Sequence, residues 1–371
     1  MRSTSLLMQA KAAIPDIKQL PTKHKVSLAY TIHWPHKTVN PNINIKPREP
    51  VIFLHGVFGS KKNYRDYCQT IANQNYTPVY SLDFRNHGES EHAFPLVNYS
   101  TLTQDVVDFI HEHKLEKVDI VGYSLGAKVA LLTLLKHPEL CRSGVIIGNA
   151  PIKTPQVKVY LKAFIKALKA LGDKRPEIKS NDKAWRAKAR DVMRKYIPDG
   201  DILHYLLRNI DIRKPKNITE YKPGTINFSM PISHFDNKVV EDIADWPEEE
   251  VEGLKFEGPV RVIRGTQSVF INDKGLAAYQ KHFPNYTLTN FNSNHLIWAE
   301  RPLQVTKVVS DFLKKTRLLE MDGSAKALEE SPKESYSRPP AHQQPLHKND
   351  FTHIDVGALP VNGAQAESTQ A

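Results

Sequence analysis

The stretch VDIVGYSLGAKVA constrains the fold of this 371-residue chain more than any other. The apolar run Val118–Val121 is followed at once by GYSLG at 122–126 and then by apolar residues at helical spacing. This order predicts a strand, a tight turn and a helix, the context that gives a G-x-S-x-G pattern chemical meaning. In so sharp a turn, side chains at Gly122 and Gly126 would collide with the neighbouring strand and helix. The hydroxyl of Ser124 would then stand exposed above the sheet edge, so Ser124 is the candidate nucleophile.

Short apolar runs alternate with stretches of helical spacing along most of the chain. The other predicted strands are Val51–Leu54, Pro78–Leu82, Val145–Ile147, Val260–Ile263 and Tyr286–Phe291, and the helices include Thr103–His113 and Leu125–His137. This alternation predicts an α/β fold, a mostly parallel sheet with helices on both faces. The alternating run Val26–Trp34 precedes this pattern and predicts an antiparallel hairpin at the sheet edge.

Residues 152–258 interrupt the alternation between the fourth parallel strand and the next. This stretch is predicted to be largely helical, beginning with the amphipathic basic run Val157–Leu171. Open α/β sheets bind ligands at the carboxyl ends of their strands, so an insertion at this point would cover a site there. We therefore expect a core formed by residues 25–151 and 259–317, with residues 152–258 as a helical lid insertion.

The two ends of the chain differ from the core in composition. The first acid is Asp16, and it is preceded by Arg2, Lys11 and several hydroxyl residues. This composition fits a mitochondrial targeting segment over residues 1–24, with the frayed end of a cytoplasmic protein as the alternative. Residues 318–371 are rich in Pro, Ser, Gln and charge and lack apolar periodicity, which predicts a disordered tail.

Charge is distributed unevenly along the chain. There are 51 Lys and Arg against 40 Asp and Glu, a net charge of +11. Residues 152–222 carry 19 basic and 8 acidic side chains, whereas residues 223–258 carry 2 and 9. No interleaved aromatics or reading helix accompany the basic stretch, so we expect no nucleic-acid partner. A basic lid could instead attract an anionic substrate such as an acyl-CoA, or make peripheral contact with an anionic membrane surface.

Simple counts argue against several other classes of protein. Two cysteines, Cys68 and Cys141, are too few for a disulfide framework, match no zinc spacing and indicate a reducing compartment. The chain contains no run of 18 uninterrupted apolar residues, so no membrane-spanning helix is predicted. No metal-binding or nucleotide-binding motif is found, and we expect no cofactor beyond an acyl-CoA co-substrate.

A second glycine-containing loop follows the strand Val51–Leu54 and reads HGVFGS from residue 55. Acyl transfer needs two preorganised backbone N–H groups to stabilise the oxyanion of the tetrahedral intermediate. The amide of Leu125, directly after the candidate nucleophile, would supply one donor. The amide of Val57 would supply the other, with that of Phe58 as the near alternative. The glycines would let this loop approach a substrate closely.

A third loop, DFRNHGES from residue 83, follows the next predicted strand. We interpret it as a structural loop in which Asp83 and Arg85 pair and brace the strand ends. His87 is interpreted as a braced loop histidine and not as a catalytic base.

The candidate base is His295, one of 16 histidines in the chain. In sites of this strand–turn–helix type, the order along the chain is serine, then acid, then histidine. His295 follows the strand Tyr286–Phe291 and stands in a loop that opens a helix, which is the place this order predicts.

The acid that would orient His295 is absent from both expected positions. After the strand Val260–Ile263 the sequence reads RGTQSV, and no carboxylate occurs before Asp273, which could reach the histidine only if its loop bends back. After the strand Val145–Ile147 it reads GNAP, where Asn149 could serve as a neutral orienting group. Because the acid holds the imidazole in the useful tautomer, its loss predicts weakened or lost activity.

Taken together, these motifs resemble one family. They are HGVFGS at 55–60, DFRNHGES at 83–90, GYSLGAK at 122–128, NAP at 149–151, RGTQS at 264–268 and HLIWAERP at 295–302. From residue 51 to about residue 309 the chain resembles the α/β-hydrolase superfamily, and within it the mitochondrial abhydrolase group that includes fungal ethanol and alcohol acetyltransferases and related esterases. The resemblance implies Ser124 as nucleophile and His295 as base. It also implies an acid in a pattern like D-x-[AS]-P after the sixth strand, and that position holds Gly148.

Members of this group split an acyl ester or thioester through an acyl-serine. Water as the acceptor gives an esterase or thioesterase, and an alcohol gives an ester product. The resemblance thus implies a serine-dependent alcohol O-acetyltransferase that uses acetyl-CoA, with esterase or thioesterase side activity. Two alternatives stay open: a simple carboxylic-ester hydrolase, and a hydrolase fold that acts as a binding protein because Gly148 replaces the acid.

Overall fold

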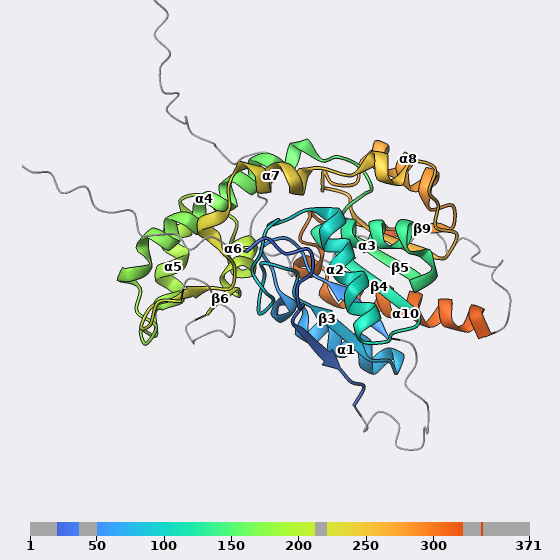
Figure 1. Cartoon of the computed structure of the whole chain (residues 1–371), viewed down its shortest axis with the longest axis horizontal. Coiled ribbons are helices and arrows are strands. Elements are labelled where there is room, and N and C mark those ends of the chain that lie inside the picture. The colour runs from blue at the N-terminus through green and yellow to red at the C-terminus, as the bar shows by residue number, and fades with distance from the viewer. Residues whose placement is uncertain (1–20, 37–49, 212–220, 322–334, 337–371) are drawn as a thin grey trace, which may run out of the picture.

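A computed structural model describes residues 21–36, 50–211, 221–321 and 335–336, and Figure 1 draws the remainder in grey. The predicted targeting segment lies almost wholly outside these ranges, as does most of the predicted tail. Two described elements fall within the stretch predicted as tail. Helix α10 (Pro302–Met321) runs past residue 317, and the two-residue strand β10 (Ser335–Tyr336) pairs in parallel with β9 (Tyr286–Phe291).

Within the described residues, the core is one eight-stranded sheet. Its other strands are β1 (Tyr30–His33), β2 (Val51–Leu54), β3 (Val79–Leu82), β4 (Val118–Tyr123), β5 (Cys141–Ile147) and β8 (Val260–Gly265). The spatial order is β1-β3-β2-β4-β5-β8-β9-β10, and every neighbouring pair is parallel except β1 with β3. Strands β2, β4 and β5 are buried along their whole length, as expected when helices cover both faces. The predicted α/β fold with a mostly parallel sheet is confirmed.

The predicted hairpin at the sheet edge is wrong, although the antiparallel sense of the edge strand is right. β1 pairs with β3, so that Tyr30 lies opposite Leu82, and it does not pair with its sequence neighbour β2. The reason is that β2 lies between β3 and β4, so both of its edges are already used. The edge that β1 covers belongs to β3.

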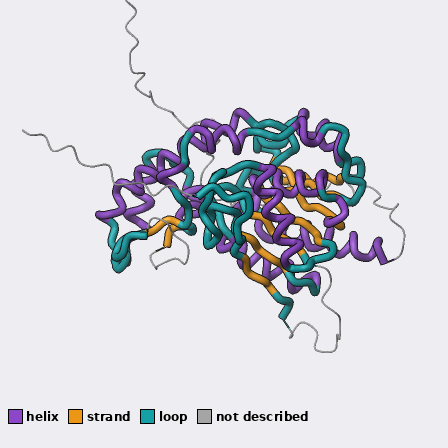
Figure 2. The backbone as a smooth tube through the Cα atoms, viewed as in Figure 1, coloured by secondary structure: helices purple, strands orange, loops and turns teal. Residues whose placement is uncertain are grey.

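Helices cover both faces of the sheet, as Figure 2 shows. α1 (Arg65–Asn75) and α10 pack on one face, and α2 (Tyr99–Glu112), α3 (Leu125–Lys136) and α8 (Asp273–His282) pack on the other. The described short helices are η2 (Lys61–Tyr64), η3 (Pro138–Leu140), η4 (Pro155–Val157), η5 (Arg175–Glu177), η6 (Ile232–His234), η7 (Glu248–Val251) and α9 (Ile297–Glu300). Among the helices of the described ranges, none is long and apolar enough to cross a membrane.

Residues 152–258 form a group of helices between β5 and β8, which are neighbours in the sheet. We call this segment the helical insertion. It comprises α4 (Lys158–Lys174), α5 (Trp185–Arg194), α6 (Gly200–Leu207), the paired strands β6 (Ile210–Asp211) and β7 (Asn227–Phe228), and α7 (Asn237–Ala244). In Figure 1, α4, α5 and α6 lie together to one side of the sheet. Helix α4 buries Leu161, Ile165 and Leu168 and exposes the lysines between them, which explains its amphipathic sequence.

A buried lysine on α3 contacts both ends of the helical insertion. The Nζ atom of Lys128 donates to Thr154 Oγ1 at 3.2 Å and to the backbone oxygen of Asp245 at 2.8 Å. Thr154 lies near the start of the insertion, and Asp245 directly follows α7. Burial lowers the pKa of Lys128 to about 7. These contacts fix the insertion beside the helix that begins after Ser124.

Candidate active site

Ser124 lies in the turn between β4 and α3 in a backbone conformation that few residues other than glycine adopt. Its φ is 53° and its ψ is -110°. The neighbouring backbone holds it there, since its N–H donates to the Ile147 oxygen at 2.9 Å. A Cβ atom on Gly122 would lie 2.2 Å from the Gly126 oxygen, and one on Gly126 would lie 2.3 Å from the Leu54 oxygen. Close packing of the turn therefore requires both glycines.

His295 contacts Ser124 from the loop between β9 and α9. Its Nε2 atom lies 2.9 Å from Ser124 Oγ, a distance suited to proton transfer. The backbone oxygen of His295 accepts a hydrogen bond from the Tyr123 hydroxyl at 2.9 Å. The imidazole stacks on the ring of Phe270, with 3.8 Å between centroids and an interplanar angle of 14°. The structure thus brings together the predicted nucleophile and the predicted base.

The other ring nitrogen of His295, Nδ1, has no hydrogen-bond partner among the described residues. Asn149 bonds elsewhere, because its Nδ2 atom donates to the Ser124 backbone oxygen at 3.1 Å and its Oδ1 atom accepts from Ala150 N–H. Asp273 is exposed at the start of α8. Neither of these two candidates for the acid hydrogen-bonds His295 in the part of the chain that the structure describes.

Gly148 lies where an acid would face the unpartnered nitrogen. It directly follows β5 and has a φ of 71°. A Cβ atom built on Gly148 would lie 3.3 Å from Nδ1 of His295 and 3.3 Å from its Cε1. The position that the family resemblance assigns to the acid therefore faces Nδ1, and with a glycine there that nitrogen has no acceptor in the part of the chain that the structure describes.

Burial lowers the pKa of His295 to about 3, because the charged imidazolium is poorly solvated among apolar side chains. The neutral imidazole is therefore the form present at pH 7, and it can accept a proton at Nε2. With Nδ1 unpartnered, however, no hydrogen bond fixes which of the two nitrogens carries the proton.

The amides predicted to stabilise an oxyanion differ in their partners. Among the described residues, the N–H groups of Val57 and Leu125 donate no hydrogen bond within the protein. The N–H of Phe58 is occupied, since it donates to His87 Nε2 at 3.3 Å. His87 itself donates from Nδ1 to the Arg85 oxygen at 2.9 Å, and it is therefore a braced loop histidine. Of the two loop amides considered, that of Val57 is the one left able to bind an oxyanion.

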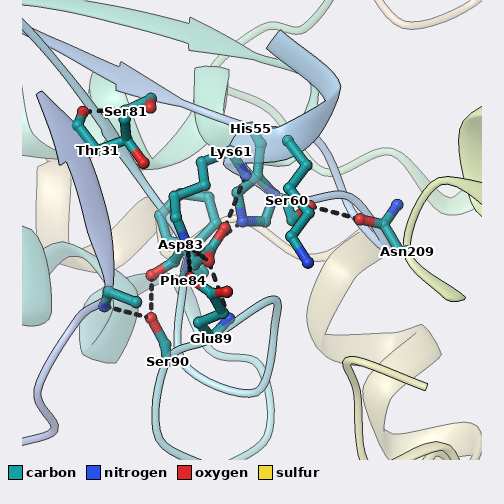
Figure 3. A network of polar contacts seen from close by, with 12 residues as sticks. Thr31, His55, Ser60, Lys61, Ser81, Asp83, Phe84, Glu89, Ser90 and Asn209 are labelled. Atoms are coloured by element: carbon teal, nitrogen blue, oxygen red, sulfur yellow. Dashed lines mark hydrogen bonds and ion pairs between the residues drawn. The ribbon is translucent and has the colours of Figure 1, made fainter. Parts of the chain in front are cut away.

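Ion pairs brace the loop after β3, but not the pair that was predicted. Asp83 pairs with Lys61 and accepts a hydrogen bond from the Glu89 N–H at 2.9 Å (Figure 3). Arg85 pairs with Asp105 of α2 at 2.6 Å, and both of these side chains are fully buried. The predicted Asp83–Arg85 pair is wrong because each buried charge meets an opposite charge on a different element packed against the loop.

Two hollows adjoin Ser124. The larger has an empty volume of about 780 Å³, including its open mouth, and its walls are mostly apolar. The smaller, of about 410 Å³, shares Ser124, Phe270 and His295 with the larger. Tyr160 and Phe164 of the helical insertion line both. Over the described ranges, no group of three or more His, Cys, Asp or Glu is placed to hold a metal ion.

Sequence reasoning missed two residues of this site. Phe270 lies in the loop after β8, and its stacking on His295 depends on how that loop folds. Tyr205 belongs to α6, yet its hydroxyl donates to the Gly56 oxygen at 3.0 Å. The paired glycines of HGVFGS indicate that something approaches that loop closely, but they do not indicate which residue.

Comparisons with known proteins find relatives along most of the chain. A model described as the alpha/beta hydrolase fold matches residues 49–166. A probable alcohol acetyltransferase of Cyberlindnera jadinii is 62% identical over 317 residues, covering 85% of this chain and 89% of the relative. Ethanol acetyltransferase 1 of Wickerhamomyces anomalus is 49% identical over 305 residues, covering 81% of this chain and 78% of the relative. A solved marine microorganism esterase matches with a TM-score of 0.63 at 26% identity, covering 77% of this chain and 99% of the esterase.

The fold and these relatives define the class of protein, and the chain belongs to the α/β-hydrolase superfamily. It is an enzyme of this type, as predicted. The sequence identity to the acetyltransferases places the chain in a narrower group of this superfamily. Within the superfamily, the chain belongs to the group of yeast proteins named alcohol or ethanol acetyltransferases, which confirms the predicted family.

Proposed function

We propose that this enzyme transfers an acetyl group from acetyl-CoA to an alcohol through an acetyl-Ser124 intermediate. The observation that carries the proposal is the 2.9 Å contact between His295 Nε2 and Ser124 Oγ, next to two backbone amides that have no partner among the described residues. The names of the relatives, alcohol acetyltransferase and ethanol acetyltransferase, support the choice of reaction. The site would therefore act as a serine–histidine dyad in which no carboxylate of the described residues contacts the base.

The first half of the reaction forms the acyl-enzyme. Nε2 of His295 accepts the hydroxyl proton as Ser124 Oγ attacks the thioester carbonyl, and the N–H groups of Val57 and Leu125 stabilise the oxyanion that forms. The intermediate then collapses, the carbon–sulfur bond breaks, and the departing sulfur takes the proton from Nε2 to leave as a thiol.

The second half transfers the acetyl group to the acceptor. An alcohol gives its proton to Nε2 of His295 as its oxygen attacks the acetyl carbon on Ser124. Collapse of this second intermediate breaks the bond to Ser124 Oγ, which regains a proton from the imidazolium, and the acetate ester leaves. Water in place of the alcohol gives hydrolysis, which is the esterase alternative. The mostly apolar walls of the larger hollow favour an alcohol with a carbon chain over water.

The basic first part of the helical insertion, residues 152–222, supports acetyl-CoA as the donor. Lys162, Lys166 and Lys169 of α4 are exposed, as are Arg186 and Lys188 of α5. A basic surface raises the local concentration of a polyanionic substrate, and salt weakens this attraction. We therefore expect the KM for acetyl-CoA to rise several-fold between low and high salt, while the KM for an uncharged acetate ester stays constant. Equal salt dependence for both substrates would remove this support.

The experiment that tests the proposal measures ester formation from acetyl-CoA and ethanol by the wild-type enzyme and by Ser124→Ala. We expect the variant to lose at least about 10³-fold in kcat, because the covalent route disappears. Equal rates in the two proteins would overturn the proposal. Covalent labelling by a fluorophosphonate probe separates it from the binding-protein alternative, since a silent fold would leave Ser124 unlabelled.

A further inference from the structure

One side chain of the helical insertion contacts the loop that carries the oxyanion donor. The hydroxyl of Tyr205, on α6, lies 3.0 Å from the Gly56 oxygen and 3.3 Å from the Val57 oxygen, and it is the donor in these contacts. The Gly56 carbonyl belongs to the same peptide unit as the Val57 N–H. In a trans peptide the oxygen and the hydrogen point in opposite directions, so a group that holds one also aims the other.

The same peptide oxygen receives two further hydrogen bonds from within the loop. His55 accepts at Nε2 from the Phe84 N–H at 3.1 Å, so its proton is on Nδ1, which donates to the Gly56 oxygen at 2.7 Å. Burial lowers the pKa of His55 to about 4, and it is neutral at pH 7. The Gly59 N–H also donates to this oxygen, at 3.1 Å, so three donors bind one carbonyl. They strengthen the peptide dipole, and the opposite N–H becomes a better donor to an oxyanion.

The two glycines of the loop make room for the Tyr205 hydroxyl. A Cβ atom on Gly59 would lie 2.0 Å from that oxygen, and one on Gly56 would lie 3.1 Å from it. The contact is therefore closely fitted and excludes larger residues at position 59. Tyr64 adds to it, because its hydroxyl is hydrogen-bonded to that of Tyr205.

Another residue of the helical insertion, Asn209, also holds the oxyanion loop, at the peptide that follows Phe58. Asn209 donates from Nδ2 to the Phe58 oxygen at 3.0 Å, and its Oδ1 atom accepts from Ser60 Oγ at 2.5 Å (Figure 3). Together with Tyr205, this side chain attaches the helical insertion to the oxyanion loop at two successive points. The position of the loop therefore depends on the position of α6.

We propose that Tyr205 is a positioning residue for the oxyanion hole. Through its hydroxyl, the orientation of the Val57 N–H depends on how the helical insertion packs against the loop. This inference rests on the proposed acyl transfer through Ser124. It assigns to the insertion a part in transition-state stabilisation as well as in forming the wall of the pocket.

The test compares Tyr205→Phe with the wild type and with Tyr67→Phe as a matched control. Phenylalanine keeps the ring that lines the larger hollow and removes only the hydroxyl. Tyr67 is also half-buried, and its hydroxyl donates to a backbone oxygen, that of Trp298 at 3.3 Å, away from the hollows. Two rates are measured: hydrolysis of p-nitrophenyl acetate, and labelling of Ser124 by an uncharged fluorophosphonate, whose phosphoryl oxygen enters the oxyanion hole.

We expect Tyr205→Phe to lower kcat about tenfold with KM unchanged within twofold, less than the 10²–10³-fold loss on removing a donor itself. The labelling rate should fall by the same factor, and Tyr67→Phe should alter neither rate. Unchanged rates in Tyr205→Phe, or a rise in KM alone, would overturn the role of Tyr205. If wild-type Ser124 does not label at all, the proposed function fails, and the inference fails with it.

Discussion

The two side chains proposed to react in this enzyme, Ser124 and His295, are held in opposite ways. Ser124 is fixed by backbone: a strained turn, a hydrogen bond to the Ile147 oxygen and two glycines that admit no larger residue. His295 is held by stacked aromatic rings, those of Phe270 and Tyr123, and its Nδ1 atom contacts no acceptor within the described residues.

This difference indicates which catalytic step is impaired. The serine side retains its strained turn and two amides without a partner among the described residues, so we expect attack on a carbonyl and stabilisation of the oxyanion to be preserved. On the histidine side, none of the described residues supplies the group that selects the tautomer and stabilises the imidazolium. A buried polar atom without a partner also costs about 1–3 kcal/mol. Proton transfer, and not substrate binding, should therefore limit the rate.

Among the changes that test this comparison, the largest expected effect comes from supplying an acid with Gly148→Asp. The new carboxylate would face Nδ1 of His295, and we expect kcat to rise about 10²-fold, part of the roughly 10⁴-fold that the acid contributes in a complete triad. A full gain is not expected, because residue 148 has a φ of 71° and its Cβ would lie 3.3 Å from the imidazole. Ester formation at pH 7.5 measures the change.

Gly148→Ala is the matched control for this variant. Alanine adds the same Cβ atom and the same backbone strain without a carboxylate, so it should leave kcat unchanged or lower it. If the Asp and Ala variants behave alike, the unpartnered Nδ1 is not what limits this enzyme.

The stacking of Phe270 should have a smaller effect. We expect Phe270→Leu to lower kcat about tenfold, because the imidazole of His295 loses the surface that holds it toward Ser124 while the pocket keeps an apolar side chain. The same substitution in Gly148→Asp should cost less, since a carboxylate would then hold the ring as well. Rates from the four proteins form a double-mutant cycle. Equal losses in both backgrounds would show that stacking does not orient the histidine.

The part of the site that could be predicted from the sequence is the part fixed by local backbone. The strand–turn–helix order located Ser124, and the requirement for glycine at 122 and 126 follows from the sharpness of the turn. The resemblance assigns the acid position to Gly148, and a Cβ atom built at that position would lie 3.3 Å from His295 Nδ1.

The remainder depends on contacts between distant segments, which no local pattern encodes. Tyr205 reaches the oxyanion loop only because α6 packs against it, and Phe270 reaches His295 only through the fold of its loop. The wrong pairing of Asp83 with Arg85 has the same origin. Two opposite charges close in sequence predict an ion pair. In the fold, however, Lys61 pairs with Asp83 and Asp105 pairs with Arg85, and both come from other elements.

The smallest expected effect is the response of the wild-type rate to pH. It tests the histidine side of the site directly, because it depends on the protonation of His295. A base works while it is unprotonated, and the pKa of His295 is lowered by burial to about 3. As pH falls from 8 to 5.5, kcat/KM for an uncharged ester should change by less than about twofold, whereas a base of ordinary pKa near 6.5 would lose about tenfold. In Gly148→Asp the carboxylate should raise the pKa of His295, so that the fall of kcat/KM at acidic pH moves toward neutral pH. Circular dichroism at each pH controls for unfolding. An acid limb near pH 6.5 in the wild type would mean that some acceptor reaches Nδ1 during turnover.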